Sequence, residues 1–167
     1  MTIEEAIKTA IEFEAQVGGF YRRASENASD SVGKRVFKVL ADEEQMHREY
    51  LKSKLDEWRK TGKITAKKLD TAIPSTERVT EGMSKLKTRK GGRDRGGELQ
   101  MLAEALDVEL KTSNFYKKMV KELPADGQQL FEHFVEIEEG HLAIVRAEID
   151  YLSKTGYWFD FKEFDME

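Results

Sequence analysis

The chain has 167 residues, the length of one ordinary domain, and 36% of them are charged. It has no cysteine, which excludes disulfides, thiolate zinc sites and iron–sulfur clusters. No apolar run approaches the roughly 18–20 residues that a membrane span requires, and the acidic N-terminus is unlike a secretory signal. We therefore expect a single cytoplasmic domain over residues 1–167 with no membrane partner.

Four long segments have the three- and four-residue spacing of apolar side chains that is typical of amphipathic helices. The first two are predicted over residues 2–27 and about 31–61, separated by a turn with N-cap chemistry. The other two are predicted over about 97–122 and about 126–155, with Pro124 opening the last. The composition and the periodicity together predict an all-α protein.

Two segments depart from this pattern. In the crossover, residues 62–96, Pro74 and the glycine pairs at 91–92 and 96–97 predict loops, with one short helix over 76–87. The tail, residues 156–167, reads GYWFDFKEFDME and is strongly aromatic. We expect it to pack across the helices or at a subunit interface, and we expect a homo-oligomer, with a dimer favoured.

The crossover region is also basic. Residues 59–97 carry 12 Lys and Arg against 4 Asp and Glu, a local charge of +8. Because the net charge of the whole chain is −4, the remaining residues together carry −12. Such a segment could contact nucleic acid or an acidic partner protein. A solvated connection is the favoured interpretation, and we do not expect nucleic acid as a partner.

The two halves of the chain are similar in sequence. AIEFEAQVGGFYRRA at 10–24 aligns with ALDVELKTSNFYKKM at 105–119, and FKVLADEEQMH at 37–47 aligns with FEHFVEIEEGH at 131–141. We interpret the protein as two repeated helical hairpins, about 2–61 and about 97–155, that form a four-helix bundle. The long crossover allows the second and third helices to run parallel.

Three polar positions recur in both halves, each near the middle of a predicted helix and each interrupting an apolar stripe. They are Glu14, Glu44 and His47 in the first half and Glu109, Glu138 and His141 in the second. Because the helix midpoints of a bundle fall at one level, four carboxylates and two imidazoles should meet in one layer. The alignment selects Glu44 for this layer rather than Glu43, because Glu43 aligns with Ile137.

Charged groups on a core face are costly unless they are paired or bound to metal. Four carboxylates in one layer would also repel one another and raise one another's pKa. A pair of divalent cations removes both costs, and oxygen ligands with one imidazole per metal suit iron or manganese, with zinc as a further occupant. The alternative is that these are surface residues repeated by duplication.

The duplicated Glu-x-x-His pattern resembles the ferritin-like superfamily and, within it, rubrerythrin-like proteins without a rubredoxin domain. The resemblance covers both hairpins and implies a ferritin-like bundle whose two iron ions are bound by the six residues above, with Glu44 or Glu109 among the bridging carboxylates. It implies reduction of hydrogen peroxide or dioxygen in oxidative-stress defence, with electrons from a separate donor protein. Ferroxidase activity with iron storage, a DNA-shielding mini-ferritin, and a structural metal site are the alternatives.

The chain departs from the family pattern at Thr112, where many rubrerythrins carry an additional glutamate one turn after the ligand of the third helix. Tyr21 and Tyr116, each seven residues after a candidate ligand, could orient the carboxylates, or could be ordinary core tyrosines. His133 lies five residues before Glu138, so we expect it to point away from the layer.

Overall fold

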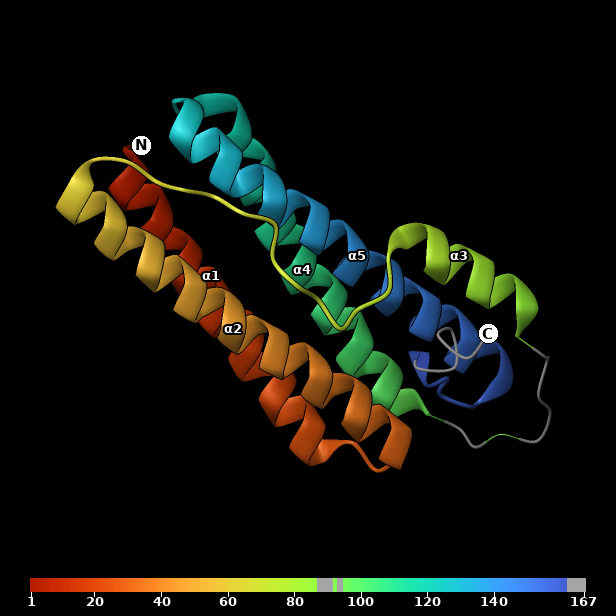
Figure 1. Cartoon of the computed structure of the whole chain (residues 1–167). Helices are drawn as coiled ribbons and strands as arrows, with labels where there is room; N and C mark the ends of the chain where they lie inside the picture. Colours follow the sequence, from red (N-terminus) through yellow and green to blue (C-terminus); the bar gives the residue numbers. More distant parts are fainter. Residues whose placement is uncertain (87–91, 93–94, 162–167) are drawn as a thin grey trace.

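The computed structural model describes residues 1–86, 92 and 95–161. The described residues form helices and no strands, which confirms the all-α prediction. The helices are α1 (Ile3–Asn27), α2 (Ser31–Thr61), α3 (Thr76–Lys85), α4 (Gly96–Glu122) and α5 (Ala125–Thr155) (Figure 1). No helix in this part of the chain is long and apolar enough to cross a membrane.

Local capping chemistry accounts for the helix bounds. Thr2 and Glu5 form a capping box at the start of α1, and Asp30 accepts two backbone N–H groups at the start of α2. Gly62 and Gly156 end α2 and α5 in the left-handed conformation, with φ of 68° and 74°. Each capping signal lies within a few residues of the helix end that it defines. The helix bounds predicted from the sequence are therefore close to those of the structure.

The loop predicted at Gly96–Gly97 was wrong, because these two glycines form the first turn of α4. Glu98, in the same turn, accepts hydrogen bonds from the backbone of Ser29 and Asp30 at the α1–α2 connection. The contact between Glu98 and the α1–α2 connection therefore stabilises a helical first turn, although the two glycines alone indicate a loop. The predicted end of the short helix at residue 87 lies outside the described residues.

The long helices form two antiparallel hairpins, α1 with α2 and α4 with α5 (Figure 1). α1 also packs against α4, and α2 runs in the same direction as α4, as the crossover predicts. Residues 62–75 follow the bundle lengthwise between α2 and α5, and α3 then lies on α5. The crossover thereby covers one long side of the bundle.

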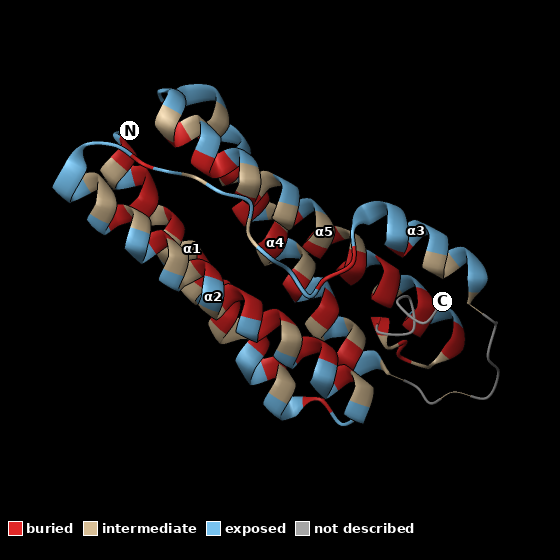
Figure 2. Cartoon of the chain, in the orientation of Figure 1, coloured by how far each residue is buried: buried red, intermediate tan, exposed pale blue. Residues whose placement is uncertain are grey.

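The apolar core has two parts, one on each side of the helix midpoints. One contains Ile7, Leu51 and Phe134, and the other contains Phe37, Leu102 and Ile144. Buried positions line the inner faces of all four long helices (Figure 2). The interval between the two apolar clusters is occupied by buried charged side chains, as described below.

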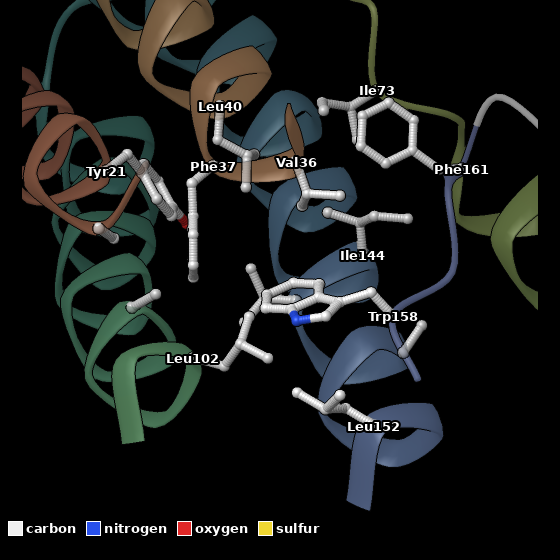
Figure 3. Packing of buried hydrophobic residues seen from close by; sticks show 14 of the residues in the cluster. Tyr21, Val36, Phe37, Leu40, Ile73, Leu102, Ile144, Leu152, Trp158 and Phe161 are labelled. Atoms are coloured by element: carbon white, nitrogen blue, oxygen red, sulfur yellow. The ribbon is translucent and has the colours of Figure 1, made fainter. Parts of the chain in front are cut away.

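The beginning of the tail closes one end of the bundle. Trp158, Phe159 and Phe161 are each at most 3% exposed, and the Trp158 ring packs edge-on against Phe37 with centroids 5.3 Å apart (Figure 3). The indole Nε1 donates a hydrogen bond of 2.6 Å to Glu98 Oε2. Up to residue 161, the tail therefore packs on the bundle of its own chain; the remainder lies outside the described residues.

Candidate metal centre

The structure brings all six predicted residues together in one layer between the two apolar clusters. α1 provides Glu14, α4 provides Glu109, and α2 and α5 each provide a Glu-x-x-His pair. Each of the six side chains is at most 1% exposed. The surface-residue alternative is therefore wrong for these positions.

The potential ligand atoms form two overlapping groups, and within each group they lie within 4.8 Å of one another. The groups are Glu14, Glu44, His47 and Glu138, and Glu44, Glu109, Glu138 and His141. Glu44 and Glu138 belong to both groups, whereas Glu109 belongs to one. This geometry favours Glu44 and Glu138 as the shared carboxylates of a two-ion site.

Both imidazoles present Nδ1 to the carboxylates. Nδ1 of His141 lies 3.1 Å from Glu44 Oε1 and 3.4 Å from Glu109 Oε1. Nδ1 of His47 lies 3.5 Å from Glu14 Oε2 and 3.6 Å from Glu44 Oε2. The two rings stack with centroids 5.8 Å apart, so each half of the layer has its own imidazole.

Local packing brings the helices close enough for this arrangement. Gly18 lies one turn after Glu14 on α1, and a Cβ atom at this position would lie 3.2 Å from Glu44 Cβ. A larger side chain would push α2 away from α1 at the level of the layer. The glycine therefore positions Glu44 beside Glu14.

Two buried tyrosines orient the carboxylates from the opposite hairpin. Tyr21 of α1 donates a hydrogen bond of 2.7 Å to Glu109 Oε1 on α4. Tyr116 of α4 donates to Glu14 Oε1 on α1. Burial and the negative charges of the layer raise both tyrosine pKa values, so the hydroxyls remain donors. Each tyrosine thereby holds one carboxylate oxygen, and the second oxygen of each carboxylate has no hydrogen-bond partner among the described residues.

Burial and neighbouring charges shift the pKa values of the acids and of His141 in the layer. Burial and the nearby charge of Glu109 raise the pKa of Glu138 well above its usual range. Burial opposes the charged form of Glu109 as well, but its contacts with Glu138, His141 and Tyr21 together outweigh burial and lower its pKa. Burial disfavours protonated His141, yet the carboxylates of Glu109, Glu43 and Glu44 raise its pKa. Protons on Glu138 and His141 would offset the mutual repulsion of the carboxylates.

A metal pair fits the donor set better than protons do. Among the described residues, many buried atoms of the layer have no hydrogen-bond partner: Glu14 Oε2, Glu109 Oε2, both carboxylate oxygens of Glu44 and Glu138, both ring nitrogens of His47, and His141 Nδ1. Buried polar atoms without partners are costly. Divalent cations would satisfy the carboxylate oxygens and the Nδ1 atoms together, so these groups could hold metal.

One buried acid was missed by the sequence reasoning. Glu43 is 1% exposed, and its Oε2 lies 3.0 Å from Nε2 of His141 and 3.9 Å from Nε2 of His47. The comparison of the two halves pointed away from it, because its counterpart Ile137 is apolar. Its other contacts are with the crossover, which carries no periodic signal, so nothing in the sequence indicated this role.

Two further positions lie outside the set of candidate ligands. The Thr112 hydroxyl donates to the backbone oxygen of Val108 at 3.0 Å, as is common for threonine within a helix. Thr112 thus provides a hydroxyl rather than a carboxylate at the position where many rubrerythrins carry an additional glutamate. His133 is half-buried and lines a groove between α5 and the crossover, as expected for a residue that points away from the layer.

Two helical hairpins joined by a long crossover, with a buried carboxylate and imidazole layer between them, define a ferritin-like bundle. The chain belongs to the rubrerythrin family, whose family model matches residues 5–149. This match confirms the resemblance seen in the sequence and supports a di-iron carboxylate protein. A search of curated proteins returned no match, and a search of solved structures returned none.

Proposed function

We propose that this protein reduces hydrogen peroxide or dioxygen at a carboxylate-bridged di-iron centre in oxidative-stress defence. The observation that carries the proposal is the pair of four-residue groups that share Glu44 and Glu138. Glu14 and His47 would complete one iron site, and Glu109 and His141 the other. Manganese or zinc could occupy the same donors.

The residues around the layer suit such a reaction. When bound, two ferrous ions supply the two electrons that, with two protons, convert one hydrogen peroxide into two water molecules. Tyr21 and Tyr116 hold Glu109 and Glu14 in place, and the apolar clusters on both sides keep bulk water away. Because the chain has no cysteine, the electrons that restore the centre would come from a separate donor protein.

The test is rapid mixing of the ferrous-loaded protein with hydrogen peroxide under anaerobic conditions. We expect fast oxidation with one peroxide consumed for every two irons. His141→Gln should lose this reaction, and His133→Gln is the matched control, because His133 lies outside the layer. Slow oxidation that does not depend on peroxide would contradict the proposal.

Iron handling is the second candidate, because the same layer could oxidise ferrous iron for storage or for a DNA-shielding mini-ferritin. We propose a homodimer, whereas storage requires a closed shell of many subunits. Size-exclusion chromatography separates these assemblies. Salt-sensitive retention of DNA, which the basic crossover could provide, would favour the mini-ferritin.

A further inference from the structure

Glu43 lies between the histidine rings and the crossover. Its carboxylate accepts hydrogen bonds from the Thr71 hydroxyl at 2.8 Å and from the Ala72 backbone N–H at 2.6 Å. On the other side, Oε2 lies 3.0 Å from Nε2 of His141 and 3.9 Å from Nε2 of His47. One buried carboxylate therefore connects the crossover with the His141 imidazole, and the His47 ring lies beside it beyond hydrogen-bond distance.

The contact with His141 determines which ring nitrogen faces the layer. An ionised carboxylate only accepts hydrogen bonds, so Nε2 of His141 is the protonated nitrogen that donates to Glu43. In the neutral ring, Nδ1 then carries the free lone pair, and it lies 3.1 Å from Glu44 Oε1 on the side of the candidate ligands. This is the tautomer that a metal at the layer requires.

The two hairpins differ at this position. The counterpart of Glu43 in the second hairpin is Ile137, whose side chain cannot accept a hydrogen bond. Nε2 of both histidines therefore points to a single carboxylate on α2, and the closer contact is with His141 of the other hairpin. The crossover lies between α2 and α5, where Thr71 and Ala72 hydrogen-bond the Glu43 carboxylate.

We propose that Glu43 is a positioning residue that couples docking of the crossover at Thr71 and Ala72 to metal binding at His141. The inference rests on the proposed function in taking His141 as a metal ligand. Docking of the crossover orients the Glu43 carboxylate, which orients the His141 imidazole. Since coupling between two sites is reciprocal, a bound metal should in turn hold the crossover in place.

Cobalt(II) is a suitable probe, because its visible spectrum reports coordination and its binding needs no turnover. Glu43→Gln should bind cobalt about 10–100-fold more weakly than the wild type, the usual effect of losing the partner of a ligand histidine. Thr71→Val keeps the Glu43 carboxylate but removes the crossover hydroxyl that donates to it, and should weaken binding about fivefold. Glu49→Gln, an exposed substitution on the same helix as Glu43, and Thr80→Val, whose exposed hydroxyl donates to Thr76 within α3, should bind cobalt as the wild type does.

Hydrogen exchange provides a readout that is independent of affinity. The Ala72 amide donates to Glu43, so its exchange in the wild type should slow when cobalt is added. In Glu43→Gln this slowing should be lost or strongly reduced. Equal protection of Ala72 with and without cobalt in the wild type would overturn the coupling.

The outcomes separate this inference from the proposed function. Equal cobalt affinity in the wild type, Glu43→Gln and Thr71→Val would overturn the inference alone. If Glu43→Gln does not fold, Thr71→Val decides the question. A protein that shows the affinity differences but whose ferrous form does not react with peroxide would contradict the proposed function alone, and a wild type that binds no cobalt would overturn both.

Discussion

At the scale of single residues, Glu138 and His141 make the metal-free fold sensitive to alkaline pH. The pKa of each is raised in the folded state, Glu138 by burial and the charge of Glu109, and His141 by neighbouring carboxylates that overcome its burial. Above about pH 6.5 the unfolded chain has released both protons, whereas the folded layer retains them. Stability from these groups is therefore complete at low pH and is lost as pH rises through the raised pKa values.

The first prediction is that the metal-free protein becomes less stable between pH 6 and pH 9. Urea unfolding after treatment with a chelator should show a falling midpoint over this range. Glu138→Gln keeps the shape of the side chain without a titrating group, so its midpoint should depend less steeply on pH. A midpoint that rises with pH would contradict the proton balance of the layer.

The second prediction concerns Tyr21, whose hydroxyl donates to the buried carboxylate of Glu109. Tyr21→Phe should lower the free energy of unfolding by about 1.5–3 kcal/mol, the range for hydrogen bonds to charged groups. Tyr50→Phe is the matched control, because the hydroxyl of this half-buried residue contacts the crossover backbone at Lys67 rather than a buried carboxylate, and the substitution should change stability by about 0.5 kcal/mol. Equal effects of the two substitutions would show that Tyr21 is an ordinary core residue.

Residue positions were predictable where the two halves of the sequence align. Glu14 and Glu109, like the two Glu-x-x-His pairs, were found because each has a counterpart in the other half. Glu43 was missed because it lacks one, and because its partners Thr71 and Ala72 lie in the crossover. A contact between a helix and an irregular segment leaves no periodic trace in the sequence.

At the scale of elements, the four long helices were predictable because their caps and apolar stripes are local signals. The start of α4 was not, since it depends on the contact of Glu98 with Ser29, Asp30 and Trp158. The tail has no helical period, and the surface that it covers is made by α2 and α5 together. Such surfaces exist only after the helices have packed.

The third prediction tests how the tail docks on α2. A Cβ atom at Gly33 would lie 2.7 Å from Cε2 of the buried Trp158 ring. Gly33→Ala gains about 0.5–1 kcal/mol of helix stability, but overpacking against the ring costs about 1–3 kcal/mol. We expect a net loss of stability and a red shift of the Trp158 fluorescence, read in a Trp58→Phe background.

Gly97→Ala provides the control for this substitution. It lies in the first turn of α4, and an added Cβ would meet no described atom within 4 Å beyond its chain neighbours and the backbone of its own helix. The same change should therefore leave stability unchanged or raise it by up to about 1 kcal/mol. A stabilised Gly33→Ala would mean that Trp158 does not pack on α2 in solution.

At the scale of the whole molecule, the two hairpins meet at a layer to which each contributes three candidate ligands. Neither hairpin brings a complete site, because each four-residue group draws on both hairpins. Folding of the bundle and formation of the metal centre should therefore depend on each other. The subunit arrangement has no local signal in the sequence, and the homodimer remains a proposal.

The fourth prediction follows from the sharing of ligands. Glu44→Gln removes a carboxylate that belongs to both groups, so it should reduce the metal content below one ion per chain. His47→Gln affects one group only and should retain about one ion. Elemental analysis of the two variants distinguishes a shared pair of sites from two independent sites, for which both variants would retain one ion.

The iron content of the wild-type protein purified without oxygen decides whether the buried layer is a di-iron centre. We expect two iron ions per chain, held by Glu14, Glu44, His47, Glu109, Glu138 and His141. Protein that contains no iron, and that takes up none when ferrous ions are added, would contradict the assignment of the buried layer as a di-iron centre.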